Sequence, residues 1–108
     1  MAVDAPAAVE PYTDRPLDMA DKRNLLVREY LNGFEAFATG VNLGLYDINV
    51  VNRLRGTMII RSWALYEPWV TARRSLFSQA SYYAELERLA ADLSQLRRDG
   101  GQPDVEVV

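Results

Sequence analysis

Five arginines lie close to two tryptophans in the middle of the chain, and this combination of side chains is the one best suited to binding chemistry. Arg61 precedes Trp63, and Arg73 and Arg74 follow Trp69. Basic side chains beside aromatic rings bind nucleic acids through phosphate contacts and base stacking. Arginines spread over a helical stretch do not share one face, which favours pairing within the chain or exposure to solvent. The five are Arg53, Arg55, Arg61, Arg73 and Arg74.

Carboxylates give weaker signals. Glu35 lies in an apolar stretch and needs a partner if it is buried, for which Arg61 or Arg73 are the natural candidates. A magnesium site could be drawn from Glu35, Asp47 and Glu67, but no spacing supports it, and Asp47 is better explained as a helix cap. We therefore predict no metal site.

Nucleophile and phosphate motifs do not occur in the chain. Gly40 and Gly44 are not followed by Gly-Lys-Ser/Thr, and the chain contains no cysteine and no histidine. This excludes disulfides, thiolate chemistry, Cys/His zinc sites, imidazole bases and His-ligated haem in these residues. We expect a protein that is not an enzyme, with no catalytic residues and no cofactor.

The charge is unevenly distributed along the 108 residues, which carry a net charge of −3. Residues 1–21 hold five acids and one base, and residues 99–108 hold three acids, whereas the body between them is basic. One interpretation is that the acidic ends are solvated tails. The alternative is that the body has a basic face, which binds an acidic partner or is covered by the chain's own tail. With 49% hydrophobic and 25% charged residues, the composition predicts one globular domain.

No membrane or export segment is evident in the sequence. Residues 1–21 lack a positive start and an apolar run, and the apolar stretch at 36–46 is shorter than the ~20 residues that a spanning helix needs. We expect a soluble, cytoplasmic protein without membrane contact.

The domain boundaries follow from proline, glycine and helical periodicity. Three prolines in residues 1–17 predict an extended or disordered arm, and Gly100-Gly101 followed by Pro103 predicts a flexible tail at 99–108. Between them, residues 18–98 show apolar side chains at helical spacing. We predict an all-α bundle of three to five helices, the first over about 19–43 and ended by Gly40 or Gly44.

The later helices are expected to be interrupted. Asp47 caps the second helix, Gly56 interrupts it, and Pro68 ends or bends it near Tyr66. Ser81 is the expected N-cap of the last helix, and Gly100 its C-cap. That helix carries leucines at coiled-coil spacing, which we interpret as packing within the domain or, alternatively, as a homodimer seam. The seam comprises Leu86, Leu89, Leu93 and Leu96.

Several segments resemble the domain of unknown function 4760 family, small helical bacterial and phage-associated proteins. The resemblance is carried by Leu31-Asn-Gly-Phe-Glu-Ala-Phe-Ala-Thr-Gly-Val41, Gly44-Leu-Tyr-Asp47, Ile60-Arg-Ser-Trp63, Glu67-Pro-Trp-Val70, Arg73 and Tyr82-Tyr-Ala-Glu-Leu-Glu87. It implies a helical fold and brings no established activity. Many members that resemble this chain carry a membrane helix upstream of the matching segments. This chain has the proline-rich acidic arm there instead.

Three functions are considered from these observations. The first is a protein-binding module, concretely a phage or mobile-element inhibitor that blocks a host complex, as anti-CRISPR proteins do, since Trp, Tyr and Arg dominate binding hot spots. The second is a nucleic-acid-binding or regulatory protein, and the third a homo-oligomeric structural module. The expected binding surface comprises the five arginines with Tyr46, Trp63, Tyr66 and Trp69, although core packing explains the tryptophans equally well.

Overall fold

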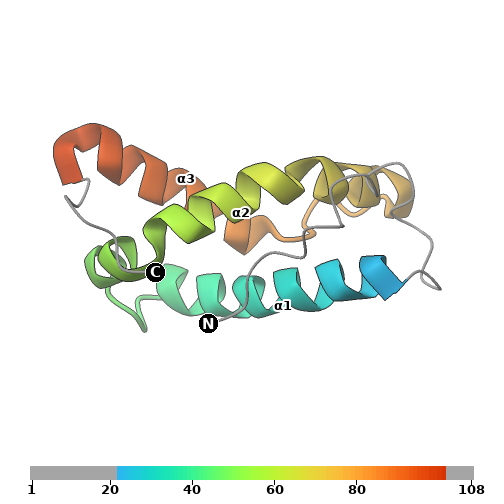
Figure 1. Ribbon diagram of the computed structural model, residues 1–108, viewed down its shortest axis with the longest axis horizontal. Helices are drawn as coiled ribbons and strands as arrows, with labels where there is room; N and C mark the ends of the chain where they lie inside the picture. The colour runs from blue at the N-terminus through green and yellow to red at the C-terminus, as the bar shows by residue number, and fades with distance from the viewer. Residues whose placement is uncertain (1–21, 102–108) are drawn as a thin grey trace.

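The computed structural model describes residues 22–101, which form three α-helices and a closing turn. The elements are α1 (Lys22–Asn42), α2 (Ile48–Phe77), α3 (Ala84–Leu96) and the π-helical turn η2 (Arg97–Gly101). In Figure 1, α2 runs back along α1, and α3 returns across both toward the beginning of α2. These residues contain no strand, so the predicted all-α class is confirmed.

The predicted boundaries are only partly covered by this description. The arm predicted at residues 1–17 and the tail from residue 102 onward lie outside the described residues. The turn η2 carries the described structure past the predicted boundary at residue 98, with non-helical backbone at Gly100. Gly100 has φ 91°, the left-handed conformation that ends a helix and was expected of this glycine.

Helix α1 buries the face that the periodicity predicts. Val27, Leu31 and Ala38 are fully buried against the other two helices. The helix ends where Gly44 adopts φ 82°, and the N–H of Leu45 donates to the carbonyl of Gly40 at 2.9 Å. This glycine-ended cap satisfies carbonyls that the last turn leaves without helical partners.

Helix α2 is continuous, so the predicted interruption at Gly56 and the predicted end near Tyr66 are both wrong. The Asp47 carboxylate accepts from the N–H of Asn49 at 2.8 Å and caps the helix as predicted. Pro68 lies inside the helix on its solvent side, and Ala64, whose carbonyl loses its helical partner there, is also exposed. Because water can bind that carbonyl, the proline costs too little to end a helix held by its buried face.

The core lies where α3 packs on α1 and α2. Leu86, Leu89 and Leu93 are fully buried there, so the seam proposed for a homodimer faces the inside of its own chain. Aromatic rings fill the space between α1 and α2, with the centroids of Tyr30 and Tyr66 5.6 Å apart in an edge-to-face arrangement. A homodimer through this seam would require α3 to leave its own core.

Buried polar groups in this core are hydrogen-bonded. The Tyr30 hydroxyl and the Ser62 hydroxyl lie 2.9 Å apart, and the Trp69 indole N–H donates to Asn24 Oδ1 at 3.1 Å. Both contacts join α1 to α2 in the interior, where an unpaired polar group costs about 1–3 kcal/mol. They therefore fix the register of the two helices.

The first turn of α3 is capped by a side chain from α1. The N-cap residue, Tyr83, makes no side-chain cap bond, and the predicted cap Ser81 precedes it in the loop. Instead, Glu35 accepts from the N–H of Leu86 through Oε1 at 2.7 Å and from the N–H of Glu85 through Oε2 at 3.2 Å. The carboxylate meets the positive end of the helix dipole, which stabilises both partners.

These contacts correct the expected partner of Glu35. The carboxylate is bound by backbone N–H groups and not by Arg61 or Arg73. Asn42 strengthens the junction, because its Nδ2 donates to the carbonyl of Glu85 at 3.1 Å and to Glu85 Oε1 at 2.9 Å.

The other end of α3 is attached to α2 by an arginine. Arg97 Nε donates to Asn52 Oδ1 at 2.9 Å, Nη1 to Thr57 Oγ1 at 2.7 Å and Nη2 to the Asn52 carbonyl at 3.2 Å. A Cβ atom at Gly56 would overlap the Arg97 guanidinium and lie 2.7 Å from Asn52 Oδ1. Gly56 therefore gives the guanidinium room against α2.

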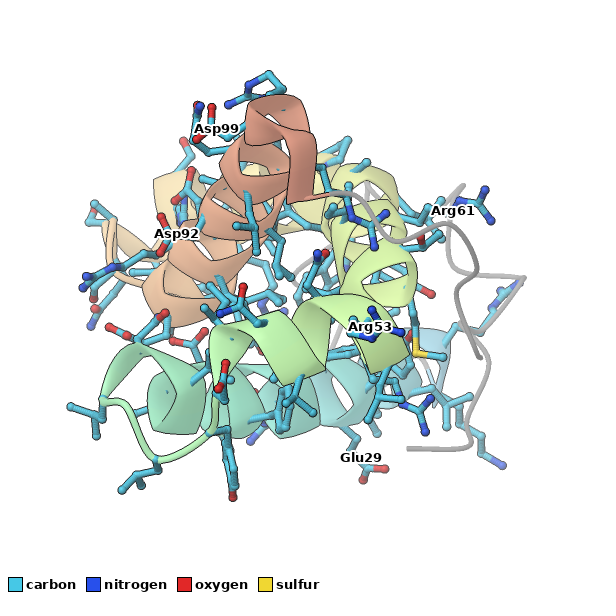
Figure 2. The ribbon with its side chains drawn as sticks, turned by 90° about the vertical axis from the view of Figure 1, so that its left-hand side faces the viewer. Glu29, Arg53, Arg61, Asp92 and Asp99 are labelled. Carbon is cyan, nitrogen blue, oxygen red and sulfur yellow. The ribbon has the colours of Figure 1, made fainter. Side chains whose placement is uncertain are left out.

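We predict that Glu35→Ala lowers the free energy of unfolding by about 1–3 kcal/mol, because two N–H groups lose a charged acceptor. Urea denaturation measures the change. The matched control is Glu29→Ala, since Glu29 lies on the same helix and points away from the other two (Figure 2). Equal effects of the two substitutions would contradict the capping role.

We predict opposite signs for two glycine-to-alanine substitutions in helices. Gly33→Ala should stabilise the fold by about 0.5–1 kcal/mol, because nothing lies within 4 Å of its added Cβ. Gly56→Ala gains the same helix propensity but loses charged hydrogen bonds of Arg97, worth about 1.5–3 kcal/mol, so it should be destabilising. Thermal unfolding measures both, and stabilisation by Gly56→Ala would contradict the proposed attachment.

Candidate functional site

Exposed apolar side chains gather at the end of the bundle where α1 turns into α2. Leu43 and Leu45 are each 72% exposed, and three further residues at about half exposure continue the surface onto α2. We call these residues the turn patch. It comprises Leu43, Leu45, Tyr46, Val50 and Leu54. Single exposed apolar residues are ordinary, but a continuous group of them is typical of an interaction site.

Tyr46 is held in place although half of it is exposed. Its ring lies so close to Gly40 that an added Cβ would be 2.6 Å from Tyr46 Cε2. The ring also stacks on Phe37, with centroids 5.3 Å apart and planes at 19°. The glycine is therefore needed for the close approach, and the aromatic part of the turn patch has a fixed orientation.

A cavity of about 450 Å³ opens beside this ring. Leu45, Tyr46, Val50 and Leu54 line its apolar side, and Arg55 lies at its border. A smaller cavity of about 140 Å³, lined by Phe34, Phe37, Arg55 and Ile59, continues along α2. Arg55 is thus shared by both hollows.

The predicted arginines fall into separate regions. Arg55 is half-buried and lines the cavity at the turn patch, whereas Arg53, directly before Leu54 in the sequence, is exposed. Figure 2 shows Arg53 on the first turns of α2, whereas Arg61 projects from another side of the bundle. Of the predicted surface, Tyr46 and Arg55 line the same cavity, whereas Arg73 packs on the Trp69 ring and Arg74 lies 5.8 Å from the Trp63 ring centroid.

Tyr66 and Trp69 were predicted as surface residues, and this part of the prediction is wrong. Tyr66 is 1% exposed and Trp69 is fully buried. The alternative interpretation of Trp69 as a core residue is confirmed, while Trp63 is half-buried and packs against the core.

Arg73 and Arg74 are held by contacts within the chain. Arg73 is 7% exposed, with its guanidinium 4.7 Å from the Trp69 ring centroid and 5.1 Å from that of Phe77. Arg74 donates to the Tyr82 carbonyl at 2.8 Å and pairs with Glu87 at 3.0 Å. Both side chains therefore order the end of α2 and the loop that follows.

A third hollow, of about 560 Å³, lies between α1, the end of α2 and that loop. We call it the arginine cavity, because Arg28 of α1 and Arg73 of α2 both line it. Asn32, Glu35, Tyr82 and Tyr83 also contribute to its walls. The sequence pattern does not place Arg28 and the two tyrosines at one site, because their convergence depends on the loop conformation.

Tyr83 adopts an unusual conformation at this cavity. Its φ of 58° is left-handed, which costs a non-glycine residue about 1–2 kcal/mol. Its hydroxyl donates to Asn32 Oδ1 at 2.8 Å, and its ring centroid lies 6.3 Å from that of Trp69. Burial raises the pKa of Tyr83, while the nearby Arg73 and Arg28 act to lower it.

One family model matches most of the chain. The model described as "Domain of unknown function (DUF4760)" matches residues 4–93. The chain belongs to this family. No curated protein and no solved structure matches it.

The described residues of this family member offer neither a metal cluster nor a membrane-spanning helix. Among residues 22–101, no group of three or more metal-ligating side chains could hold an ion. None of the described helices combines the length and the apolar character needed to cross a bilayer.

We predict that the stability of this DUF4760 protein falls as the pH rises from about 10 to 12. Burial, aided by nearby Tyr30, raises the pKa of Tyr66 from 10.0 to about 12. In that interval the unfolded chain ionises Tyr66 and the folded chain does not, so unfolding gains up to about 3 kcal/mol. Denaturation of the chain and of Tyr66→Phe across this range measures it, and a stability difference independent of pH would contradict it.

Proposed function

We propose that this chain is a non-enzymatic protein-binding module that contacts its partner through the turn patch. The observation that carries the proposal is the 450 Å³ cavity, which is lined by four exposed apolar side chains, those of Leu45, Tyr46, Val50 and Leu54. Water contacts these side chains in the isolated chain, and a partner that covers them gains about 25 cal/mol for each Å² of apolar surface removed from water.

The conformation of the turn patch supports this proposal. Gly44 and Asp47 fix the backbone on both sides of the turn, and the Tyr46 ring rests on Gly40. Residues already held in their bound geometry lose little entropy on association. A fixed tyrosine beside a cavity is also a frequent binding hot spot.

The charges beside the patch indicate the chemistry of the partner. Arg55 lines the cavity of the turn patch, and the exposed Arg53 directly precedes Leu54 of the patch in the sequence. A partner that places an apolar side chain in the cavity and carboxylates around it would match both features, and such pairs increase the association rate and select the orientation. We therefore propose an apolar partner surface with an acidic rim.

The two alternatives have less support. Nucleic-acid binding needs a basic stripe, but Arg73 and Arg74 contact aromatic rings and Glu87, and Arg61 lies apart from Arg53. Self-association through the Leu86–Leu96 seam needs leucines that the core already contains.

We predict that tagged protein captures one stoichiometric protein complex from nuclease-treated lysate of the source organism. Val50→Asp/Leu54→Asp should reduce capture at least tenfold, because the two new carboxylates would lose their water in the interface without gaining a partner. The matched control, Leu65→Asp/Leu76→Asp, changes exposed leucines of the same helix outside the patch and should capture normally. Circular dichroism verifies that both variants are folded.

Three outcomes would contradict the proposal. One is capture that survives Val50→Asp/Leu54→Asp, and another is capture that needs intact nucleic acid. The third is an empty capture with and without nuclease, which directs attention to self-assembly and is checked by light scattering.

The same experiment tests the more specific proposal of a phage or mobile-element inhibitor of the anti-CRISPR type. An inhibitor should lower the activity of the captured host complex in proportion to its binding, and Val50→Asp/Leu54→Asp should restore that activity. A captured complex that retains full activity would contradict inhibition and leave the binding proposal standing.

A further inference from the structure

We propose that the groove between α1 and α2 on the side away from α3 is the docking site of the chain's own residues 4–21, with Tyr12 entering the 140 Å³ cavity. We call this surface the open groove. Its apolar residues are Leu26 and Phe37 of α1 with Met58 and Leu65 of α2. The proposal requires no partner protein, so it stands or fails independently of the proposed function.

Helix α3 covers only one of the two grooves that α1 and α2 form. On α1 it is bound by Glu35, and Leu26 lies nine residues earlier, about two and a half helical turns, so it faces the opposite side. Figure 2 shows Arg61 of α2 projecting on that opposite side. Met58 and Leu65 are three and four residues from Arg61, so they share its side of α2.

The apolar residues of the two helices lie at the same level. The hydrogen bond between Tyr30 and Ser62 joins the antiparallel helices. Leu26 precedes Tyr30 by four residues and Leu65 follows Ser62 by three, so both lie about one turn beyond that contact. Leu26 is 51% exposed and Leu65 is 36% exposed. The described residues thus leave an apolar row uncovered, of the kind that a bundle ordinarily buries.

The 140 Å³ cavity lies farther along the same groove. Phe34 and Phe37 line it from α1, and Arg55 and Ile59 line it from α2. An apolar cavity of ~150 Å³ is large enough to hold one benzene ring. The cavity therefore fits a single aromatic side chain, and the guanidinium in its lining favours a carboxylate next to that ring.

The sequence of residues 4–21 contains the matching side chains. Tyr12 is the one aromatic residue among them, and Leu17 provides a large aliphatic side chain. The segment also carries five acids and one base. Residues 48–66 of α2, by contrast, carry three arginines and no acid. The segment and this part of α2 are therefore complementary in charge as well as in apolar character.

The length of the segment allows it to run back along the open groove. It joins α1 at Lys22. Leu17 is five residues from that point and can reach ~17 Å, whereas Leu26 lies about 6 Å along α1. Tyr12 is ten residues away and can reach ~34 Å, whereas Phe37 lies about 22 Å along α1. Both side chains can therefore reach their sites at once.

The family assignment and the acids next to Tyr12 support the same occupant. The family model begins at residue 4, so the segment is part of the unit that the family shares. A short tether gives it an effective concentration of the order of millimolar at the groove. Glu10 and Asp14 lie two residues on either side of Tyr12, so their carboxylates come near Arg55 and Arg61 when the ring enters the cavity.

Nuclear magnetic resonance of the full chain tests this proposal. We expect nuclear Overhauser effects, which require direct contact, between the Tyr12 ring and both the Phe37 ring and the Ile59 methyl groups. Tyr12→Ala should shift the Ile59 methyl resonances, because the ring leaves the cavity. The matched control Val3→Ala changes an apolar residue outside the segment and should leave these resonances unchanged.

Two further variants test the contribution of charge. Glu10→Gln/Asp14→Asn should move the Ile59 methyl resonances toward their positions in Tyr12→Ala, because the segment loses its attraction to the arginines. The matched control Asp92→Asn/Asp99→Asn removes the same charge from exposed acids away from the open groove (Figure 2). It should leave the resonances in place, and equal shifts in the two variants would contradict the charge pairing.

The outcomes separate the possible occupants of the groove. Absence of contact between Tyr12 and the cavity, or Ile59 resonances that Tyr12→Ala leaves unchanged, would overturn the proposal. A mixture of isotope-labelled and unlabelled chains distinguishes contacts within one chain from contacts between two. Contacts found only between differently labelled chains would assign the groove to a second copy and overturn the intramolecular docking. The measurement uses the isolated chain, so its result does not depend on a partner at the turn patch.

Discussion

The carboxylate of Glu35 is the contact on which the arrangement of the three helices depends. Helix α3 begins after a residue that provides no side-chain cap, and Glu35 supplies the acceptor from α1 instead. Because α3 contributes Leu86, Leu89 and Leu93 to the core, fixing its first turn on α1 also fixes these leucines between the other two helices. The hydrogen bonds between Glu35 and the start of α3 thereby position the apolar contacts that α3 makes with α1 and α2.

Arg97 provides the matching attachment at the far end of α3. Its guanidinium binds Asn52 and Thr57 of α2, in the space that Gly56 leaves. Helix α3 is thus held to α1 where it starts and to α2 where it finishes. The turn patch and the arginine cavity lie near opposite ends of α2.

Local patterns were sufficient to predict the helices but not their continuity or their contacts. The apolar spacing of α1, the Asp47 cap and the Gly44 turn depend on residues close in sequence, and they were predicted correctly. Pro68 was misjudged because its cost depends on which side of α2 faces water. The role of Gly56 depends on Arg97, which is distant in sequence and folds back onto it.

The candidate site was predicted less well for a related reason. Tryptophan and arginine are frequent in binding sites. In this domain, however, Trp69 is buried in the core and Arg73 packs on its ring. The turn patch is formed by aliphatic residues such as Leu43 and Leu45, which lie between helices and contribute to no amphipathic face. Large apolar residues in a turn, at positions outside the apolar face of either helix, are the signal that could have identified the turn patch.

We propose that the turn between α1 and α2 is the surface that meets a protein partner. Hydrogen–deuterium exchange of the chain, alone and bound to its captured partner, measures which backbone N–H groups the partner protects. We predict added protection of the backbone at residues 43–55, with α3 unchanged. Protection confined to α3, or to the exposed side of α2 around Arg61, would contradict it.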